Sequence, residues 1–278
     1  MKLEMISKYP AHEQYSTPLL FIHGTLHTAA CWDVYFLDYF AQHGYAAHAL
    51  NLRGHGNSEG REKLRWTRIA DFVEDVANAV RQLPSPPILI GHSMGGFIIQ
   101  HYLEDHNAPA AVLLSSASPA GLLPTAIRTA RRQPWVFAKI NLTLSLKPML
   151  ASTKLLGEAF FSKDLPDELL VKYWEQTQDD SFMAFIDMVV LDLPKPAKVQ
   201  TPLLVLGAGR DNMIGPREIE ATARAYNTKA EIIPHVAHNS MLELRWQSVA
   251  DRILAWLNER TAANTAVQVA ELTRVISL

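Results

Sequence analysis

The sequence predicts an α/β protein in which helices cover both faces of a mostly parallel β-sheet. Short runs that are apolar throughout alternate with longer amphipathic runs, and this alternation is typical of parallel strands buried on both faces. The 278 residues are 48% hydrophobic with a formal net charge of −2, which excludes a disordered chain. A chain of this length can build one large core, or a core with a smaller lobe.

Six apolar segments are the predicted strands, and the amphipathic segments between them are the predicted helices. The clearest helix spans Ile69–Val80, where apolar side chains recur at i, i+3, i+4, i+7 and i+11 and the opposite face is charged. The predicted strands, in chain order, are Leu19–Ile22, Ala46–Leu52, Pro87–Ile90, Ala111–Ser115, Pro202–Leu206 and Glu231–Ile233.

The alternation stops between the fourth and fifth predicted strands. The intervening residues, Gly121–Lys198, have helical patterning with a basic first half and an acidic second half. We expect a helical cap, or lid, over the carboxyl edge of the sheet, where open α/β sheets bind ligands; a lobe that only packs is the alternative. The expected division is a core of residues 1–120 and 199–260, a cap of residues 121–198 and a tail of residues 261–278.

Composition argues against several classes of function. The near-neutral charge leaves no basic surface of the kind that nucleic-acid binding needs. Cys31 is the only cysteine, so neither an intramolecular disulfide nor a cysteine-based zinc site can form. Charges interrupt the N-terminus too early for a signal peptide, and no uncharged apolar run reaches the roughly 20 residues of a membrane span. We therefore expect a cytoplasmic protein.

A G-x-S-x-G motif follows the third predicted strand and precedes an apolar helical run. In this context it predicts a nucleophile elbow, a turn so sharp that Gly91 and Gly95 must be small while Ser93 presents its hydroxyl above the sheet. The N-terminal amides of the next helix point toward that hydroxyl and would stabilise an oxyanion. A phosphate cradle is the alternative for a glycine-rich turn, but neither G-x-G-x-x-G nor G-x-x-x-x-G-K-[ST] fits this segment.

A nucleophilic serine needs a base, and the base needs an orienting acid. Asp211 follows the fifth predicted strand and His238 follows the sixth, which gives the chain order expected of this arrangement. Asp211 could instead only cap an Asx turn, and His235 is the alternative base. The two histidines also form an H-x-x-H pair, but no cysteine and no third ligand at helical spacing supports a metal site.

The remaining requirement is a pair of donors for the developing oxyanion. We expect these to be the backbone N–H groups of Thr25 and Met94, because Gly24 lets the loop after the first strand approach the serine closely. His23 and His27 could pass for an H-x-x-x-H metal pair, but that spacing needs a helix, and Gly24 follows a strand. No metal or cofactor is therefore expected.

In combination, these residues resemble the α/β-hydrolase superfamily over about Leu19–Leu257. The resemblance implies an α/β-hydrolase fold with a mostly parallel sheet of about seven or eight strands, helices on both faces and an inserted helical cap. It also implies that Arg53 and His55 shape a loop beside the site without taking part in catalysis. Asn51 stands where many relatives have Asp, and Ala237 stands where Gly often precedes the catalytic histidine. The motifs that carry the resemblance are His23-Gly24, Arg53-Gly54-His55-Gly56-Asn57-Ser58, Gly91-His92-Ser93-Met94-Gly95-Gly96, Asp211 and His238.

Two further expectations come from the resemblance. The loop from Arg53 to Ser58, followed by Glu59-Gly60, is similar to that of the lysophospholipase and monoacylglycerol-lipase-like branch. The N-terminal region is short, so the antiparallel strands that often open this fold are expected to be reduced.

The serine and the resemblance together predict a serine hydrolase that cleaves a carboxylic ester through an acyl-enzyme. An apolar cap favours a small-molecule ester with a hydrophobic acyl or alcohol group, and its basic half could face an anionic lipid headgroup or a membrane surface. The same residues could instead hydrolyse a carbon–carbon bond, act as a lyase or perhydrolase, or only hold a ligand in a receptor. Ser93 disfavours epoxide opening and halide displacement, for which relatives use a carboxylate at the elbow.

Overall fold

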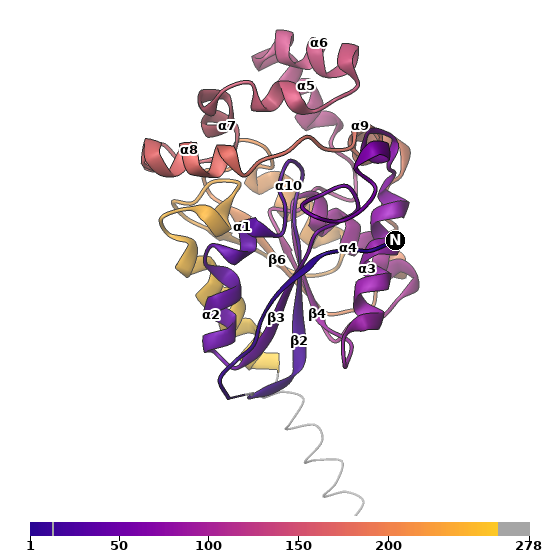
Figure 1. The fold of residues 1–278 in the computed structure, drawn as a ribbon, viewed down its shortest axis with the longest axis vertical. Helices are drawn as coiled ribbons and strands as arrows, with labels where there is room; N and C mark the ends of the chain where they lie inside the picture. Colours follow the sequence, from indigo (N-terminus) through magenta and orange to yellow (C-terminus); the bar gives the residue numbers. More distant parts are fainter. Residues whose placement is uncertain (13, 261–278) are drawn as a thin grey trace, which may run out of the picture.

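A seven-stranded sheet forms the centre of the protein (Figure 1). The structure, a computed structural model, describes residues 1–12 and 14–260, so the predicted tail of residues 261–278 lies outside the described residues. The strand order is β1-β3-β2-β4-β5-β6-β7; β1 runs antiparallel to β3, and every other neighbouring pair in this sheet is parallel. The prediction of a mostly parallel sheet is confirmed. The strands are β1 (Met5–Lys8), β2 (Tyr15–Ile22), β3 (Tyr45–Leu50), β4 (Ile88–His92), β5 (Ala111–Leu114), β6 (Leu203–Ala208) and β7 (Ala230–Ile233).

The edge strand β1 is the strand that the sequence did not predict. Its four residues are all partly exposed, with Met5 opposite Leu50 of β3. A short strand at the sheet edge has no continuous apolar run, which is the pattern by which buried strands are recognised.

Side chains alternate between the two faces along each buried strand. Leu19 and Phe21 of β2 belong to one apolar cluster, whereas Leu20 and Ile22 belong to the other. This alternation follows from the two-residue period of a strand, and it explains why both faces need a helical cover. The helices on the first face are α1 (Ala30–Asp33), α2 (Phe36–Gln42) and residues 246–260; those on the second are α3 (Ile69–Gln82), α4 (Met94–Asp105) and α10 (Pro216–Ala225).

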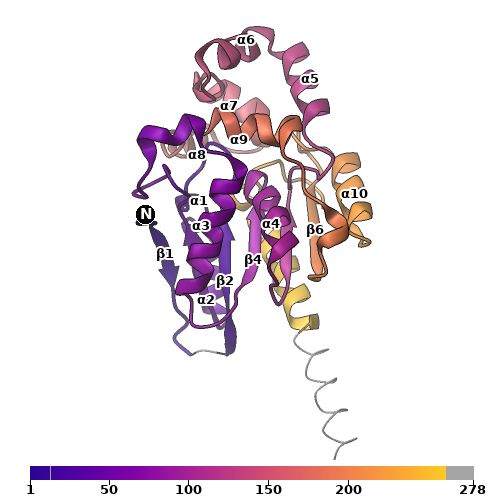
Figure 2. The ribbon, with the colours of Figure 1, turned by 90° about the vertical axis from the view of Figure 1, so that its right-hand side faces the viewer.

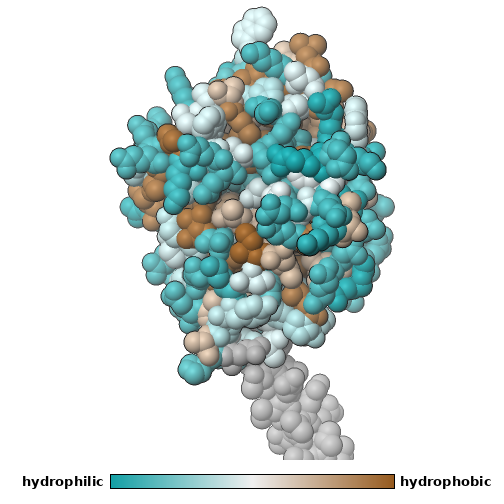
Figure 3. Space-filling view, viewed as in Figure 1, coloured by the Kyte–Doolittle hydropathy of each residue, from teal (hydrophilic) through white to brown (hydrophobic). Residues whose placement is uncertain are grey.

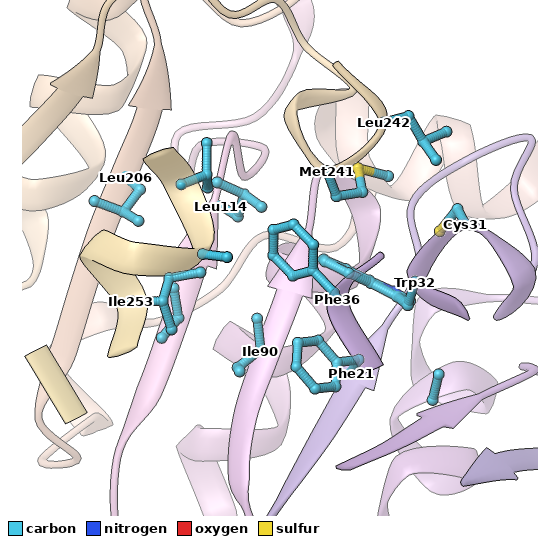
Figure 4. Close-up of a cluster of buried hydrophobic side chains, with 14 of the residues drawn as sticks. Phe21, Cys31, Trp32, Phe36, Ile90, Leu114, Leu206, Met241, Leu242 and Ile253 are labelled. Atoms are coloured by element: carbon cyan, nitrogen blue, oxygen red, sulfur yellow. The ribbon is translucent and has the colours of Figure 1, made fainter. Parts of the chain in front are cut away.

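Aromatic and aliphatic side chains pack together on the first face, as Figure 4 shows. The ring of Trp32 lies 5.0 Å from that of Phe21 and 5.3 Å from that of Phe36, centroid to centroid. Ile253 packs on the same cluster from the last helix. Complete burial of each such side chain contributes about 1.5–3 kcal/mol to stability, so this cluster fixes the helices against the strands that carry the site.

The residues between β5 and β6, which we call the insertion (residues 121–198), are helical and lie above the carboxyl ends of the strands (Figure 2). Ile140 and Phe160 of the insertion share the apolar cluster of Phe36, so the insertion packs directly on the core. No described helix has both the length and the apolar character needed to cross a membrane. The helices of the insertion are α5 (Leu123–Arg132), α6 (Pro134–Thr143), η2 (Lys147–Leu150), α7 (Thr153–Phe160), α8 (Asp167–Glu175), α9 (Phe182–Ile186), η3 (Asp187–Leu191) and η4 (Pro196–Lys198).

Candidate active site

Ser93 forms the pivot between β4 and α4, with a φ of 52°. Left-handed backbone costs a non-glycine residue on the order of 1–3 kcal/mol, and strain of this kind concentrates at functional sites. The Ser93 N–H donates a hydrogen bond to the carbonyl oxygen of Leu114 in β5 at 3.0 Å, which fixes the turn against the neighbouring strand. The strand–turn–helix context that the motif requires is therefore present.

Three glycines allow the backbone to come close at this turn. A Cβ atom on Gly91 would lie 2.5 Å from the carbonyl carbon of Gly95, and one on Gly95 would collide with a carbonyl oxygen of β2. A Cβ atom on Gly24 would lie 2.8 Å from Nδ1 of His92 and 3.0 Å from Cβ of Ser93. The loop after β2 thus packs directly against the elbow.

The structure brings Asp211 and His238 together. Nδ1 of His238 lies 2.8 Å from Oδ2 of Asp211, and both side chains are almost wholly buried. The second carboxylate oxygen, Oδ1, accepts hydrogen bonds from the backbone N–H groups of Met213 and Ile214 at 2.7 and 2.8 Å. Asp211 therefore caps an Asx-type turn with one carboxylate oxygen and contacts a histidine with the other.

His235, the other histidine of the same loop, lies apart from Asp211. It is exposed, its φ is 63°, and its Nδ1 lies 3.4 Å from Nη2 of Arg210. Of the two histidines, His238 is the one in contact with the carboxylate. Because the Nδ1–H of His238 donates a hydrogen bond to the Asp211 carboxylate, Nε2 is the ring nitrogen that carries the lone pair a general base needs.

A cavity of about 60 Å³ contains both Ser93 and His238 in its wall, together with Thr25. The rest of the wall is mostly apolar and comes mainly from the insertion. A predominantly apolar wall with a few polar groups at one end is typical of a small-molecule site. The other residues of the wall are Leu122, Thr125, Ala126, Thr129, Phe137, Ile140, Leu146, Met149, Phe160, Phe185, Met188, Met213 and Ile214.

The backbone N–H groups of interest belong to Thr25, which lines this cavity, and to Met94, which directly follows Ser93 in the chain. Neither N–H donates a hydrogen bond to any of the described residues. Met94 is the first residue of α4, and the first N–H groups of a helix have no partner within it. These two groups therefore have the chemistry expected of oxyanion donors, with the helix dipole adding positive potential.

Residues of the insertion that the sequence did not single out form hydrogen bonds with the loop beside Thr25. Oδ2 of Asp180 accepts a hydrogen bond from the backbone N–H of Leu26 at 2.8 Å, and the N–H of Gln178 donates to the carbonyl oxygen of Leu26 at 3.1 Å. Leu26 itself has a φ of 68°, so both of its peptide groups are held in a strained turn. No local motif could reveal this contact, because Leu26 and Asp180 are far apart in the chain.

Asp180 has a second partner, His55. Nε2 of His55 lies 3.3 Å from Oδ2 of Asp180, and both side chains are fully buried. Burial raises the pKa of Asp180, but His55 and the backbone N–H groups of Leu26 and Ser181 lower it more, so its pKa is below the ordinary value. The carboxylate is therefore charged at neutral pH. His55, expected to be structural, thus shares its carboxylate with the Leu26 loop.

Arg53, the other residue expected to shape this loop, binds α3. Its backbone N–H and its Nε donate to the Asp75 carboxylate at 2.8 and 2.9 Å, and its guanidinium also contacts Asp71 and Glu74. These contacts fix the loop after β3 to the helix, which agrees with a structural role.

Three further buried histidines surround the site. Burial and the nearby His55 lower the pKa of His23 to about 3, and burial lowers that of His27 to about 4. Burial and the nearby His238 lower the pKa of His92 well below its ordinary value, and Nε2 of His92 donates to the carbonyl oxygen of His238 at 2.9 Å. Three neutral rings thus support the loops that carry the site. Among the described residues, no group of three or more His, Cys, Asp and Glu side chains could hold a metal ion.

The site and the fold agree with a family comparison. A family model described as "Alpha/beta hydrolase family" matches residues 19–252. The chain belongs to this alpha/beta hydrolase family. The superfamily predicted from the sequence is thereby confirmed.

Relatives within the alpha/beta hydrolase family have different activities. Protein phosphatase methylesterase 1 from Bos taurus is 38% identical over 95 residues, which are 33% of this chain and 25% of that protein, so the match spans a quarter of its length. Monoacylglycerol lipase from Mycolicibacterium smegmatis is 25% identical over 235 residues, 78% of this chain and 80% of that protein. The crystal structure of Paleococcus ferrophilus monoacylglycerol lipase shares the fold, with a TM-score of 0.70 and 19% identity over 94% of this chain and 100% of that chain.

Proposed function

We propose that this alpha/beta hydrolase cleaves carboxylic esters, with Ser93 as nucleophile, His238 as general base and Asp211 as the group that orients the base. The observation that carries the proposal is the 2.8 Å contact between Nδ1 of His238 and Oδ2 of Asp211, on a histidine that shares one cavity with Ser93. This contact leaves Nε2 of His238 free to take a proton from a serine hydroxyl.

The reaction has two halves. Oγ of Ser93 attacks the ester carbonyl carbon while Nε2 of His238 takes the hydroxyl proton, and the N–H groups of Thr25 and Met94 stabilise the negative oxygen that forms. The intermediate collapses to an acyl-enzyme as His238 returns the proton to the leaving alcohol. A water molecule then loses a proton to His238 and attacks the acyl carbonyl carbon. The resulting intermediate collapses as His238 returns that proton to Oγ of Ser93, which releases the acid and regenerates the enzyme.

The apolar wall of the cavity supports a substrate with a hydrophobic acyl or alcohol group. Side chains such as Phe137, Ile140 and Met188 would cover such a group, whereas they offer no hydrogen bonds to a sugar or a nucleotide. Relatives named as a methylesterase and a monoacylglycerol lipase are consistent with ester chemistry. The finer assignment to the lysophospholipase and monoacylglycerol-lipase-like branch is part of the proposal.

Labelling with a fluorophosphonate, followed by peptide mass spectrometry, tests the nucleophile directly. We expect the label on Ser93 and no label in Ser93→Ala. Turnover of p-nitrophenyl esters of rising acyl length should fall by roughly 10⁶-fold in Ser93→Ala and in His238→Gln. His235→Gln is the matched control, since His235 is an exposed residue of the same loop, and it should retain nearly full activity.

Three outcomes would overturn the proposal. Ester turnover that survives Ser93→Ala would exclude Ser93 as the nucleophile. Equal losses in His235→Gln and His238→Gln would remove the distinction between the two histidines. A labelled Ser93 with no turnover of any ester would point to another reaction of the same residues, or to a receptor.

A further inference from the structure

Helices α5 and α6 have one side toward the cavity and another toward solvent. Phe137 and Ile140 of α6 line the cavity that contains Ser93. Trp135 and Leu142, by contrast, are 81% and 84% exposed. These two residues are seven positions apart, about two helical turns, so they lie on one face of α6. A large aromatic and a leucine thus project together from the outermost layer of the molecule.

Helix α5 continues this exposed apolar surface. Leu123 and Ile127 are four positions apart, one turn of α5, and both are exposed. Figure 3 shows apolar side chains among polar ones at the top of the molecule, over the helices that Figure 1 labels α5 and α6. Large apolar side chains that are exposed together often mark an interaction site.

The charged side chains around these exposed apolar residues are basic. Residues 106–157 contain no Asp or Glu, although the whole chain has 28 acidic residues against 26 basic ones. Four exposed basic side chains border the apolar residues, and none of the four forms an ion pair with a described residue. These basic residues are Arg131, Arg132, Lys139 and Lys147.

We propose that this surface docks on the headgroup region of an anionic lipid bilayer. We call it the basic apolar face, defined by Leu123, Ile127, Trp135 and Leu142 with Arg131, Arg132, Lys139 and Lys147. Tryptophan and leucine insert at the boundary between headgroups and acyl chains, while arginine and lysine neutralise lipid phosphates. An isologous dimer through the same face would bring two sets of unpaired cations together, so charge favours lipid over a second copy.

Docking would place an opening of the insertion at the lipid surface. A second cavity, of about 210 Å³, is bordered by Arg132 of α5 and Val136 of α6. Thr129, Met149 and Met213 line both this cavity and the cavity of Ser93, so the two cavities adjoin across these side chains. Provided that the proposed ester hydrolysis is correct, a docked lipid ester would enter beside these three side chains.

Vesicle flotation tests the docking independently of catalysis. The full chain carrying Ser93→Ala is mixed with vesicles of phosphatidylcholine alone, or with vesicles in which about 30% of the lipid is phosphatidylserine. Each mixture is measured at low and at physiological salt. We expect at least roughly 10-fold tighter binding to the anionic vesicles, weakened by salt. The combined variant Arg131→Gln, Arg132→Gln, Lys139→Gln should weaken binding by roughly 100-fold.

A separate variant and control test how much the exposed apolar side chains contribute to vesicle binding. Trp135→Ala with Leu142→Ala should weaken vesicle binding by at least roughly 10-fold. Trp66→Ala is the matched control, because Trp66 is 57% exposed on η1 (Arg61–Trp66), outside the basic apolar face, and it should leave binding unchanged. Made without Ser93→Ala, the substitutions of Trp135, Leu142 and Trp66 should leave hydrolysis of a water-soluble short ester unchanged.

The outcomes separate the two proposals. Equal binding to both vesicle types, or undiminished binding by the Trp135 and Leu142 variant, would overturn the docking. A concentration-dependent dimer that dissociates in that variant, with no vesicle binding, would assign the face to a second copy instead. Vesicle binding, together with an unsubstituted chain that hydrolyses no ester, would overturn the proposed function and leave the docking in place.

Discussion

Oδ2 of Asp180 accepts a hydrogen bond from the backbone N–H of Leu26 at 2.8 Å, so a buried carboxylate of the insertion fixes the peptide next to Thr25. The hydrogen bond from Gln178 to the carbonyl oxygen of Leu26 fixes the peptide on its other side. Because the N–H of Thr25 is a proposed oxyanion donor, the insertion would position part of the catalytic machinery in addition to covering the cavity.

Asp180→Asn should lower kcat for a soluble ester by about 10- to 100-fold and leave KM nearly unchanged. The amide keeps the size of the side chain but loses the charge that strengthens the bond to Leu26 and attracts His55. A donor displaced by a fraction of an ångström acts mainly on the transition state, so kcat should change more than KM. Steady-state kinetics and the rate of fluorophosphonate labelling measure the effect.

Asp179→Asn is the matched control for this prediction. The Asp179 carboxylate accepts hydrogen bonds from the Ser145 hydroxyl, the Leu146 N–H and the backbone N–H of Asp180, all inside the insertion, and none from Leu26. Similar kinetic losses in both variants, or a loss in Asp180→Asn that a lower folded fraction accounts for, would contradict a positioning role.

Asp211→Asn should reduce kcat by roughly 10⁴-fold and leave the melting temperature almost unchanged. The amide oxygen can keep the hydrogen bonds from Met213 and Ile214, so the turn should survive. The amide NH2 group would then face Nδ1 of His238, which would force the proton onto Nε2 and remove the base. Activity near the original level would show that Asp211 serves only the turn.

Gly95→Ala should destabilise the protein by at least about 3 kcal/mol or prevent folding, because its Cβ atom would collide with backbone atoms of β2 that cannot move away. Gly215→Ala is the control: a Cβ atom there meets only Oε2 of Glu218 at 3.6 Å, and the backbone is extended. It should change stability by no more than about 1 kcal/mol. Urea unfolding of both variants compares them directly, and comparable stabilities would refute the steric argument.

Stability should fall as the pH falls below about 6.5. His23 and His27 have folded-state pKa values of about 3 and about 4, and burial is the first cause in both. Unfolded histidine titrates near 6.5, so below that pH the unfolded chain binds protons that the folded chain does not. The stabilisation from each neutral ring is therefore fully present above about pH 6.5 and is lost toward the folded pKa, by about 1 kcal/mol per pH unit.

Urea unfolding at pH 7.5, 6.5 and 5.5 measures this slope, before most carboxylates titrate. His27→Gln should reduce the slope of the unfolding free energy against pH by the contribution of one titrating histidine. A free energy of unfolding that stays constant or rises toward pH 5.5 would mean that these rings are not buried in neutral form.

Local patterns were sufficient for the elements whose burial is uniform. All six predicted strands are strands. Those inside the sheet are apolar throughout where helices cover both faces, whereas β7 is a partly exposed edge strand that contains Glu231. The helix predicted over Ile69–Val80 is α3, which ends two residues later, at Gln82. The elbow was recognisable for a similar reason. The steric demand at Gly91 acts against the backbone of Gly95, within one five-residue motif, so it leaves a trace in the sequence.

Contacts between distant segments decided the rest. The sequence by itself determined the α/β sheet, the elbow at Ser93 and the order of the candidate acid and base. The sequence favoured His238 over His235, but only the tertiary structure showed His238 in contact with Asp211, and only it brought Asp180 of the insertion to Leu26. These choices depend on how loops from separate strands meet at one edge of the sheet, and such long-range packing has no periodic or motif-like signal in the chain.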